Sequence, residues 1–571
     1  MSSVPSRGYV ADPCYPPVGR PVARGWEAIA AALPTTAGVV AIDGPAIGGW
    51  EDLVAGLGKA LAEQGTDAEF VETSSWLLPW DRLQETTSSY ELRDDPDFDQ
   101  LTSRHLSELV KVPPRLQVEA GTLLVVYGPG AALAPHDVLW YADLPKRFAE
   151  AAVLAGTGLN LGQPVGAGPG TTKRLFFVDW PLIDGHRDFI AQRLDGWVDM
   201  QNGVSPTMLD GRALRATLAE LAGRPFRTRP TFNSTPWGGH WAQRTLGHSP
   251  EALNTALGYE LIAPEAGVLV GEEGGPQVEL PFQLIVAAHP QLMLGPRAHE
   301  VFGTSFPIRF DYLDTLDGGN LSVHCHPKQD YMRSIFGWPY TQHESYYVMV
   351  GGEDRRIFLG LRQDADVEQF REEAERADND GTPLEITDYI PTFPAAQHQL
   401  FLIPAGTPHG SGKGNVVLEV SATPYLYSLR FYDWLRQSAD GGYRPVHVDH
   451  AFRNLDLERR GGSVARDLVP RPRRLRTGDG WYEELLGTLP EMFFEVHRVA
   501  LMPGAVAADD TAGRFHVLNV VEGDGVIAEP SRGTGHSLVY AETMVVPAAV
   551  GAYALRSFGA GPVRVVKAFV R

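Results

Sequence analysis

Apolar positions in residues 1–225 follow two alternating patterns. Residues 50–64 carry apolar side chains at helical spacing. Short apolar runs that end at or near Gly and Pro predict strands, and they cover residues 39–42, 123–127, 138–141 and 175–178. Strands that alternate with helices in this way predict a doubly wound α/β domain with a mainly parallel sheet.

The pattern changes after residue 224, where short β-rich runs alternate with Gly and Pro turns. Two segments there have helical character, residues 364–377 and 426–437. Many short strands over the rest of the chain predict two barrels or sandwiches. The last β pattern, residues 493–571, follows a basic, turn-rich linker at residues 459–476.

These patterns predict three domains: an α/β domain at residues 1–225, a first β-barrel domain at 226–455 and a second at 456–571. A chain of 571 residues is too long for one compact core, which agrees with this division.

Composition narrows the functional classes. The formal net charge of −21 argues against a nucleic-acid or anionic-membrane binder, because those need a basic surface. Residues 1–17 lack the apolar core of a secretory signal, and no apolar run reaches the ~18 residues that span a bilayer. The two cysteines, Cys14 and Cys325, do not form a disulfide framework. We therefore expect a cytoplasmic protein with no nucleic-acid or membrane partner.

The stretch VVAIDGPAIGGWEDL, residues 39–53, follows a predicted strand and opens a predicted helix, as a phosphate-binding loop does. Gly44 and Gly49 match the pattern G-x4-G-K-[ST], but Trp50 and Glu51 replace the lysine and the hydroxyl residue that hold phosphate and Mg²⁺. Together with residues 127–147, the segment resembles a nucleoside-kinase-type, P-loop domain that has lost its catalytic loop. We interpret it as a degenerate P-loop with a structural or regulatory role.

The stretch LSVHCHPKQDY, residues 321–331, contains two histidines two positions apart. On a strand, His324 and His326 point to one face and Cys325 points to the other, so the cysteine is expected in the core. Two such histidines alone also fit ordinary hydrogen-bonded core residues. The choice between these interpretations depends on further ligands along the chain.

Two candidate ligands follow. Glu344 begins the predicted strand ESYYVMV, and the turn P-x-G-x-x-H in QLFLIPAGTPHGSG delivers His409. Three imidazoles and one carboxylate suit a divalent ion such as Zn²⁺, Mn²⁺, Fe²⁺ or Co²⁺ and leave positions open for substrate. The order H-x-H, E, P-x-G-x-x-H resembles the two-part motif of the cupin barrel.

A longer resemblance covers residues 237–436. The segments that carry it are PWGGHW (236–241), FPIRFDYLDTLDGGNLSVHCHP (306–327), HESYYVM (343–349), IPAGTPHGSGKGNVVLEV (403–420) and SLRFYDWLR (428–436). In this order they resemble the blocks of the class I mannose-6-phosphate isomerase (phosphomannose isomerase) family. The C-terminal region resembles that family's second, metal-free cupin, with Tyr553 in the region where the first barrel has its histidine.

The resemblance implies a fold and a metal site. It implies a double-cupin region of jelly-roll barrels, one divalent metal, with zinc the first expectation and Mn, Fe or Co as alternatives, and a small sugar phosphate as substrate. The metal ligands carried over are His324, His326, Glu344 and His409.

The sequence also departs from the family. His324 stands where the family usually has glutamine, and Asp311 stands where it has a lysine near the active site. Arg309 lies on the same strand face as Asp311 and is a candidate to compensate for the lost cation. One extra residue separates Glu419 from Arg430.

Isomerisation of a hexose 6-phosphate moves a proton between C1 and C2 through an enediol, which requires a general acid and base. Glu419 is the first candidate, because the family places the matching glutamate in its pocket; a salt-bridged structural carboxylate is the alternative. Lys328 is the second candidate. Arg430 is the candidate for phosphate binding, and a pair with Asp433 is its alternative role.

Two aromatic residues, Tyr346 and Trp434, are candidates for sugar contact or simply core residues. The leading hypothesis is a metal-dependent sugar-phosphate aldose–ketose isomerase, acting on mannose 6-phosphate and fructose 6-phosphate. A cupin-type metal dioxygenase explains His324 better but leaves the segment RFYDW unexplained. A non-catalytic sugar-phosphate-binding sensor is the third reading. A further hypothesis is that residues 1–225 pack on the barrel and gate its mouth.

Overall fold

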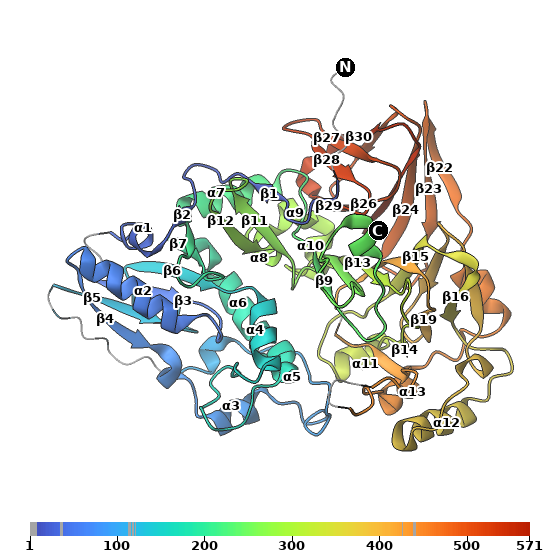
Figure 1. Cartoon of the computed structure of the whole chain (residues 1–571), viewed down its shortest axis with the longest axis horizontal. Coiled ribbons are helices and arrows are strands. Elements are labelled where there is room, and N and C mark those ends of the chain that lie inside the picture. Colours follow the sequence, from blue (N-terminus) through green and yellow to red (C-terminus); the bar gives the residue numbers. More distant parts are fainter. Residues whose placement is uncertain are drawn as a thin grey trace.

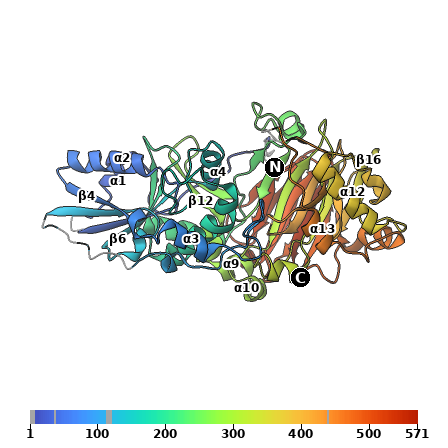
Figure 2. The ribbon, with the colours of Figure 1, turned by 90° about the horizontal axis from the view of Figure 1, so that it is seen from below.

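The computed structural model describes residues 8–34, 38–111, 116, 119, 121–424, 426–437 and 441–571. Residues 1–7, which belong to the N-terminal stretch considered above, lie outside the described part. The molecule is elongated, with an α/β unit at one end and two β-barrels at the other (Figures 1 and 2). We call these parts the α/β unit (residues 8–225), the first barrel (231–432) and the second barrel (473–570).

The α/β unit is built on a seven-stranded sheet of order β2-β8-β7-β6-β3-β5-β4. Strands β4, β5, β3, β6 and β7 run parallel, and β8 and β2 add an antiparallel edge. The strands are β2 (Ala23–Arg24), β3 (Val39–Asp43), β4 (Asp67–Glu72), β5 (Thr122–Tyr127), β6 (Val138–Asp143), β7 (Gly196–Asp199) and β8 (Thr207–Asp210). The mainly parallel sheet predicted from the apolar runs is confirmed.

Helices cover this sheet on both faces (Figure 1). They are α1 (Trp26–Ala30), α2 (Trp50–Glu63), α3 (Trp80–Thr87), α4 (Lys146–Leu154), α5 (Thr172–Arg174), α6 (Trp180–Ile190) and α7 (Gly211–Ala222). The strand predicted at residues 175–178 is wrong, because Leu175–Asp179 is a wide helical turn that continues into α6. Thr171 caps the start of this helical segment by accepting a hydrogen bond from the Arg174 amide. The apolar run is therefore the buried side of a helix start.

The first barrel consists of two antiparallel sheets of order β18-β15-β20-β13-β10-β9 and β17-β16-β19-β14-β21. The first sheet contains β9 (Thr231–Asn233), β10 (Leu257–Leu261), β13 (Ile308–Asp314), β15 (Glu344–Val350), β18 (Leu400–Ile403) and β20 (Val416–Ala422). The second contains β14 (Val323–Cys325), β16 (Gly352–Leu359), β17 (Thr392–Ala395), β19 (His409–Ser411) and β21 (Leu429–Tyr432). The helices α11 (Gln329–Ser334), α12 (Val367–Asp380) and α13 (Val448–Asn454) lie outside the sheets.

One of the two predicted helices of this region is wrong. Residues 429–432 form β21, which pairs with β14, so sheet pairing overrides the apolar spacing that suggested a helix. Trp434 and Leu435 then have positive φ values of 58° and 50°, which a helix does not allow. The other predicted helix is α12, and Asp366 caps it by accepting a hydrogen bond from the Gln369 amide.

The second barrel has sheets of order β22-β23-β24-β31-β26-β29 and β25-β30-β27-β28. Its strands are β22 (Arg473–Gly478), β23 (Trp481–Gly487), β24 (Phe494–Leu501), β25 (Val506–Asp510), β26 (His516–Glu522), β27 (Gly525–Pro530), β28 (His536–Val539), β29 (Thr543–Val546), β30 (Ala552–Phe558) and β31 (Val563–Val570). The end of the predicted linker belongs to β22. Inside the barrel, Lys567 forms ion pairs with Glu483 and Asp509, and His516 hydrogen-bonds Tyr553 at 2.8 Å.

A small three-stranded sheet joins the parts. It contains β1 (Cys14–Tyr15), β11 (Gly267–Gly271) and β12 (Gln277–Pro281), followed by α8 (Phe282–Ala288), α9 (Pro290–Leu294) and α10 (Pro296–Phe302). The largest hydrophobic cluster runs through all three parts of the molecule and includes Trp197, Phe310 and Phe515. None of the helices in the described ranges combines the length and the apolarity needed to cross a membrane.

Candidate active site

Four side chains of the first barrel converge on one point. His324 lies on β14, His326 follows that strand, Glu344 begins β15 and His409 begins β19. Each offers one ligand atom, and these atoms all lie within 4.8 Å of one another. All four residues are buried. The structure therefore brings together the histidines and the glutamate that the sequence singled out, from three strands that are far apart along the chain.

Hydrogen bonds orient the three imidazoles. The Nδ1 atoms lie 3.0 Å from the Ser322 carbonyl oxygen for His324, 3.2 Å from that of Tyr427 for His326, and 2.9 Å from that of Thr407 for His409. A carbonyl oxygen only accepts, so each Nδ1 donates to it and each Nε2 faces the cluster, where that of His326 lies 2.6 Å from Glu344 Oε2. Backbone carbonyls that fix the tautomer in this way are typical of metal-ligating histidines.

The electrostatics agree with ligation. Burial, reinforced by the neighbouring histidines, holds the pKa of His324 well below its ordinary value, and burial also lowers the pKa of His326. Neutral imidazoles are the form that binds a metal. The Nε2 atom of His409 is buried and has no hydrogen-bond partner in the described structure, although Glu344 Oε2 lies 3.2 Å away. A buried nitrogen without a partner, facing a carboxylate, fits a site whose ligand is a divalent ion.

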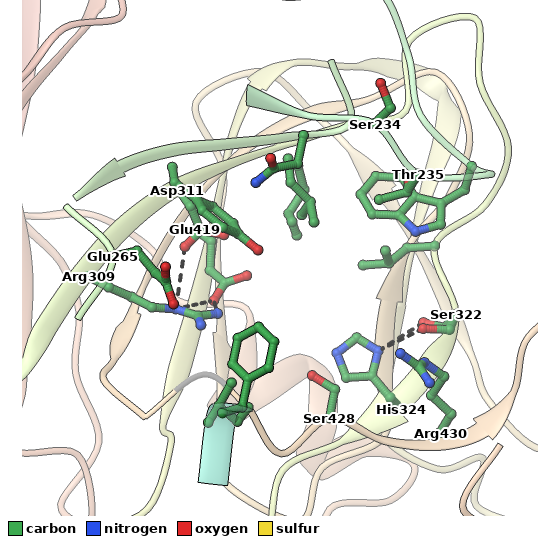
Figure 3. Close-up of a pocket in the computed structure, with 18 of the residues that line it drawn as sticks. Ser234, Thr235, Glu265, Arg309, Asp311, Ser322, His324, Glu419, Ser428 and Arg430 are labelled. Atoms are coloured by element: carbon green, nitrogen blue, oxygen red, sulfur yellow. Dashed lines mark hydrogen bonds and ion pairs between the residues drawn. The ribbon is translucent and has the colours of Figure 1, made fainter. Parts of the chain in front are cut away.

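Three members of the cluster, His324, His326 and Glu344, line a cavity of about 730 Å³, and His409 is buried behind them. Figure 3 shows Arg309, Asp311 and Glu419 on one side of this cavity and His324 and Arg430 on the opposite side. The side chains in between include Ser234, Thr235 and Trp237 from the start of the first barrel. A concave site with a few converging polar groups is the usual form of a small-molecule site.

One row of side chains forms the acidic wall of the cavity. Antiparallel pairing sets Tyr259, Asp311, Glu419 and Tyr346 side by side on β10, β13, β20 and β15. Burial raises the pKa of Asp311 to about 6 and raises that of Glu419 well above its ordinary value. Arg309 forms ion pairs with both carboxylates.

The opposite wall carries Arg430. The pair with Asp433 that the sequence left open does not form, because Asp433 instead pairs with Arg436 at 2.6 Å and Arg444 at 2.7 Å. Arg430 donates a hydrogen bond to the Pro445 carbonyl oxygen at 3.0 Å. Burial, and next the nearby Arg444, lower the pKa of Arg430 to about 10. Its guanidinium is therefore charged at neutral pH and lines the cavity.

Two candidate residues lie elsewhere. Lys328 does not line the described cavity, and its ammonium donates to the Leu455 carbonyl oxygen at 3.0 Å. The role of Lys328 as the acid or base stays a prediction, which this position does not favour. Trp434 also lies outside the lining, and its indole N–H donates to the Leu321 carbonyl oxygen at 2.9 Å. Tyr346 does line the cavity, and Cys325 is buried and points away, as expected.

The α/β unit supplies part of the cavity wall, which the sequence did not reveal. The lining residues from this unit are Asp97, Phe98, Arg147, Glu150, Ala151, Leu154 and Phe176. On α4, the residues Arg147, Glu150, Ala151 and Leu154 share one face at helical spacing. That periodicity was visible in the sequence, but nothing in it pointed to a barrel that begins after residue 225.

Relatives of known function support one family. A probable mannose-6-phosphate isomerase of Bacillus subtilis, GmuF, is 25% identical over 236 residues, which are 41% of this chain and 69% of that protein. The mannose-6-phosphate isomerase of Streptococcus mutans is 28% identical over 225 residues, 39% of this chain and 64% of that protein, so the chain spans just under two thirds of this relative. The chain is similar to class I mannose-6-phosphate isomerases.

Two further comparisons complete the picture. A crystal structure of the mannose 6-phosphate isomerase from Bacillus subtilis aligns with 60% of this chain and 99% of its own, at 19% identity and a TM-score of 0.48. Residues 25–223 match a family that is described as a domain of unknown function, DUF8485. That match covers most of the α/β unit.

Proposed function

We propose that this protein is a metal-dependent sugar-phosphate isomerase that interconverts mannose 6-phosphate and fructose 6-phosphate. The observation that carries the proposal is the convergence of His324, His326, Glu344 and His409 at a cavity that also holds Glu419. The relatives with this chain's sequence pattern are named mannose-6-phosphate isomerases, which favours this reaction over dioxygenase chemistry.

The metal has one role in this proposal. When bound by the three histidines and Glu344, a divalent ion, zinc first, supplies positive charge that stabilises negative charge on the substrate oxygens. Mn, Fe and Co also suit three imidazoles and a carboxylate.

Glu419 transfers the proton between C1 and C2. It lies in the cavity beside Glu344, and burial raises the pKa of its carboxyl well above the ordinary value, which makes the ionised form a stronger base than a solvated glutamate. Arg309 holds its carboxyl in place, assisted by the Ser421 hydroxyl, which donates to it at 2.7 Å. The buried Tyr346 hydroxyl has no hydrogen-bond partner among the described residues, so it is available to a sugar oxygen.

Asp311 takes the place of the cation that related proteins carry. Its Oδ1 atom is buried and makes no hydrogen bond in the described structure, although Arg309 Nε lies 3.4 Å away. We propose that it accepts a hydrogen bond from a sugar hydroxyl. The phosphate then binds on the far side of the cavity, at Arg430.

The α/β unit has no catalytic role in this proposal. We propose the domain boundaries 1–225, 226–455 and 456–571, with the first domain a kinase-like fold whose phosphate loop is degenerate. Trp50 and Glu51 stand in place of the lysine and hydroxyl residue of that loop. The unit instead contributes to the wall of the barrel's cavity.

The deciding experiment is a coupled assay of the full chain with mannose 6-phosphate, before and after chelation. The expected result is turnover that chelation abolishes and Zn²⁺ or Mn²⁺ restores. His409→Ala should lack both activity and stoichiometric metal, whereas Cys325→Ser, whose side chain points away from the cluster, should keep both. A folded, metal-loaded protein without turnover would refute the isomerase. In that case, tight binding of the sugar phosphate would indicate a sensor, and consumption of O₂ would indicate a dioxygenase.

A further inference from the structure

A segment of the α/β unit is inserted into the wall of the first barrel. Phe98 is 4% exposed and its ring lies 4.5 Å from that of His447. The Tyr427 hydroxyl donates to the Asp99 carbonyl oxygen at 3.1 Å, and the Leu101 amide donates to the Phe336 carbonyl oxygen at the same distance. These contacts fix the position of the neighbouring Asp97, which lines the cavity.

His447 connects this segment to Arg430. The Arg430 backbone amide donates to His447 Nδ1 at 3.2 Å, so Nδ1 is the acceptor and the proton lies on Nε2. Burial lowers the pKa of this histidine, which keeps the ring neutral. Nε2 lies 3.4 Å from Asp97 Oδ2, which is a long contact, and this nitrogen has no other partner among the described residues.

The result is a buried N–H donor whose one contact among the described residues is the long one to Asp97, in the lining of the cavity and next to an arginine. His447 is 8% exposed, and an unsatisfied buried donor of this kind costs free energy unless a ligand satisfies it. Arg430 and Arg444 line the same end of the cavity. Arg444 forms an ion pair with Asp433. Arg430 therefore faces the cavity without a paired carboxylate among the described residues.

Three arginines and two carboxylates meet at this end of the cavity, so its charge favours an anion. The side chains there are Arg430, Arg444, His447 and Asp97, together with Arg436 and Asp433, which form a pair behind them. Asp97 is the carboxylate that comes from the α/β unit. Its Oδ2 atom lies 3.4 Å from His447 Nε2, and its charge also acts on Arg430.

We propose that His447 Nε2–H and the Arg430 guanidinium form the subsite for the phosphate monoester of the substrate, and that Asp97 competes with this phosphate as an internal anion. The inference rests on the proposed sugar-phosphate substrate and adds the residues that select it. By placing Asp97 at the subsite, the α/β unit sets the affinity of a site that belongs to the barrel.

The first test measures the binding of inorganic phosphate and of mannose 6-phosphate to the full, metal-loaded chain by calorimetry. Asp97→Asn removes the competing charge and should tighten both ligands about fivefold or more, because a like charge next to the phosphate is lost. Asp94→Asn is the matched control, since Asp94 is exposed on the same segment and does not line the cavity. Unchanged or weaker binding in Asp97→Asn would overturn the proposal.

The second test separates the two nitrogens of His447. The amide of Asn reaches about as far as Nδ1 and keeps the contact with the Arg430 amide, whereas the amide of Gln reaches towards Nε2. His447→Asn should weaken phosphate binding about tenfold, and His447→Gln should retain more of it. Equal affinity in both variants and the unaltered chain would refute the subsite.

Both tests measure the affinity for phosphate and not the turnover of the substrate. A chain that binds phosphate as described but does not isomerise would refute the proposed function alone. A chain that isomerises with no response to Asp97→Asn would refute this inference alone.

Discussion

Glu419 is a buried carboxylate that lies in the cavity and is paired with Arg309. It sits on a central strand of the first barrel, beside Asp311 on one neighbouring strand and Tyr346 on the other. Burial raises its pKa well above the usual range, while Arg309 limits this effect. A carboxyl group that is both oriented by an arginine and poorly solvated is suited to exchange a proton with a bound substrate.

Glu419→Gln should therefore lower kcat by about 10²–10⁴-fold, the usual contribution of a general acid or base. The amide keeps the volume and the hydrogen bonds of the side chain, so the metal content should not change. The measurement is a kinetic assay beside elemental analysis. Glu495→Gln in the second barrel is the control and should keep full activity. A kcat within threefold of the unaltered enzyme would remove Glu419 from the mechanism.

Asp143 gives a separate prediction about pH. It ends β6 in the α/β unit, and burial raises its pKa from 3.8 to about 7. A carboxyl whose pKa is raised on folding contributes stability that is present below its unfolded pKa and is lost as the pH rises through its folded pKa. Between pH 4 and pH 7 this effect amounts to at most about 4 kcal/mol of unfolding free energy.

Asp143→Asn lacks this titration. Its stability relative to the unaltered protein should therefore rise between pH 4 and pH 7, as measured by urea unfolding at each pH. Asp67→Asn, at an exposed strand start, is the control and should show no such trend. Parallel pH curves for Asp143→Asn and the unaltered protein would contradict the prediction.

The loop between β3 and α2 is filled by side chains of the α/β unit itself. The Asp43 carboxylate accepts hydrogen bonds from the amides of Gly44 and Ala132, both at 2.8 Å, and from His186 at 2.9 Å. Trp50 fills the space inside the loop: a Cβ on Gly44 would lie 2.9 Å from its ring. A carboxylate and an indole therefore occupy the position where a phosphate would need free amides and open space.

We expect Mg-ATP at millimolar concentration to leave the melting temperature unchanged. The double variant Trp50→Lys, Glu51→Ser restores the residue types of a phosphate loop, but it should also fail to bind, because Asp43 still faces the loop amides. Differential scanning fluorimetry checks both proteins, with mannose 6-phosphate as the ligand for comparison. A nucleotide-dependent shift in the unaltered chain would show that this loop is functional.

On the scale of the whole molecule, the three parts depend on one another. A continuous hydrophobic cluster runs through them, and a fully buried ion pair at 2.6 Å joins Arg227 to Glu542 of the second barrel. Arg147 of α4 forms hydrogen bonds of 2.8 and 2.7 Å with Glu279 of the small three-stranded sheet. The α/β unit is therefore a structural part of the barrel's cavity, in line with the hypothesis that it packs against the barrel mouth.

Phe98→Ala tests this dependence. Its ring is buried between the α/β unit and the first barrel, so truncation should lower the free energy of unfolding by about 3 kcal/mol or more. Tyr90→Ala, at an 84% exposed position on the same segment, should change it by less than about 0.5 kcal/mol. Chemical unfolding measures both. Equal, small effects would mean that the two units unfold independently.

The sequence by itself determined the elements that depend on local pattern. Apolar runs located β3, β5 and β6, and the helical periodicity located α2 and α12. Strand alternation placed His324 and His326 on one face and Cys325 on the other, because side-chain direction on a strand depends only on the residue's position. Spacing then added Glu344 and His409, whose neighbouring Gly and Pro residues mark the turns that deliver them.

The tertiary structure decided what depends on pairing across long distances. Residues 429–432 form a strand that pairs with β14. The Lys328 ammonium donates to the Leu455 carbonyl oxygen, a contact between residues far apart in the sequence. The meeting of Asp97 with His447 joins residues 350 positions apart. No local periodicity encodes such a contact, since it arises only when two separately folded surfaces are packed together.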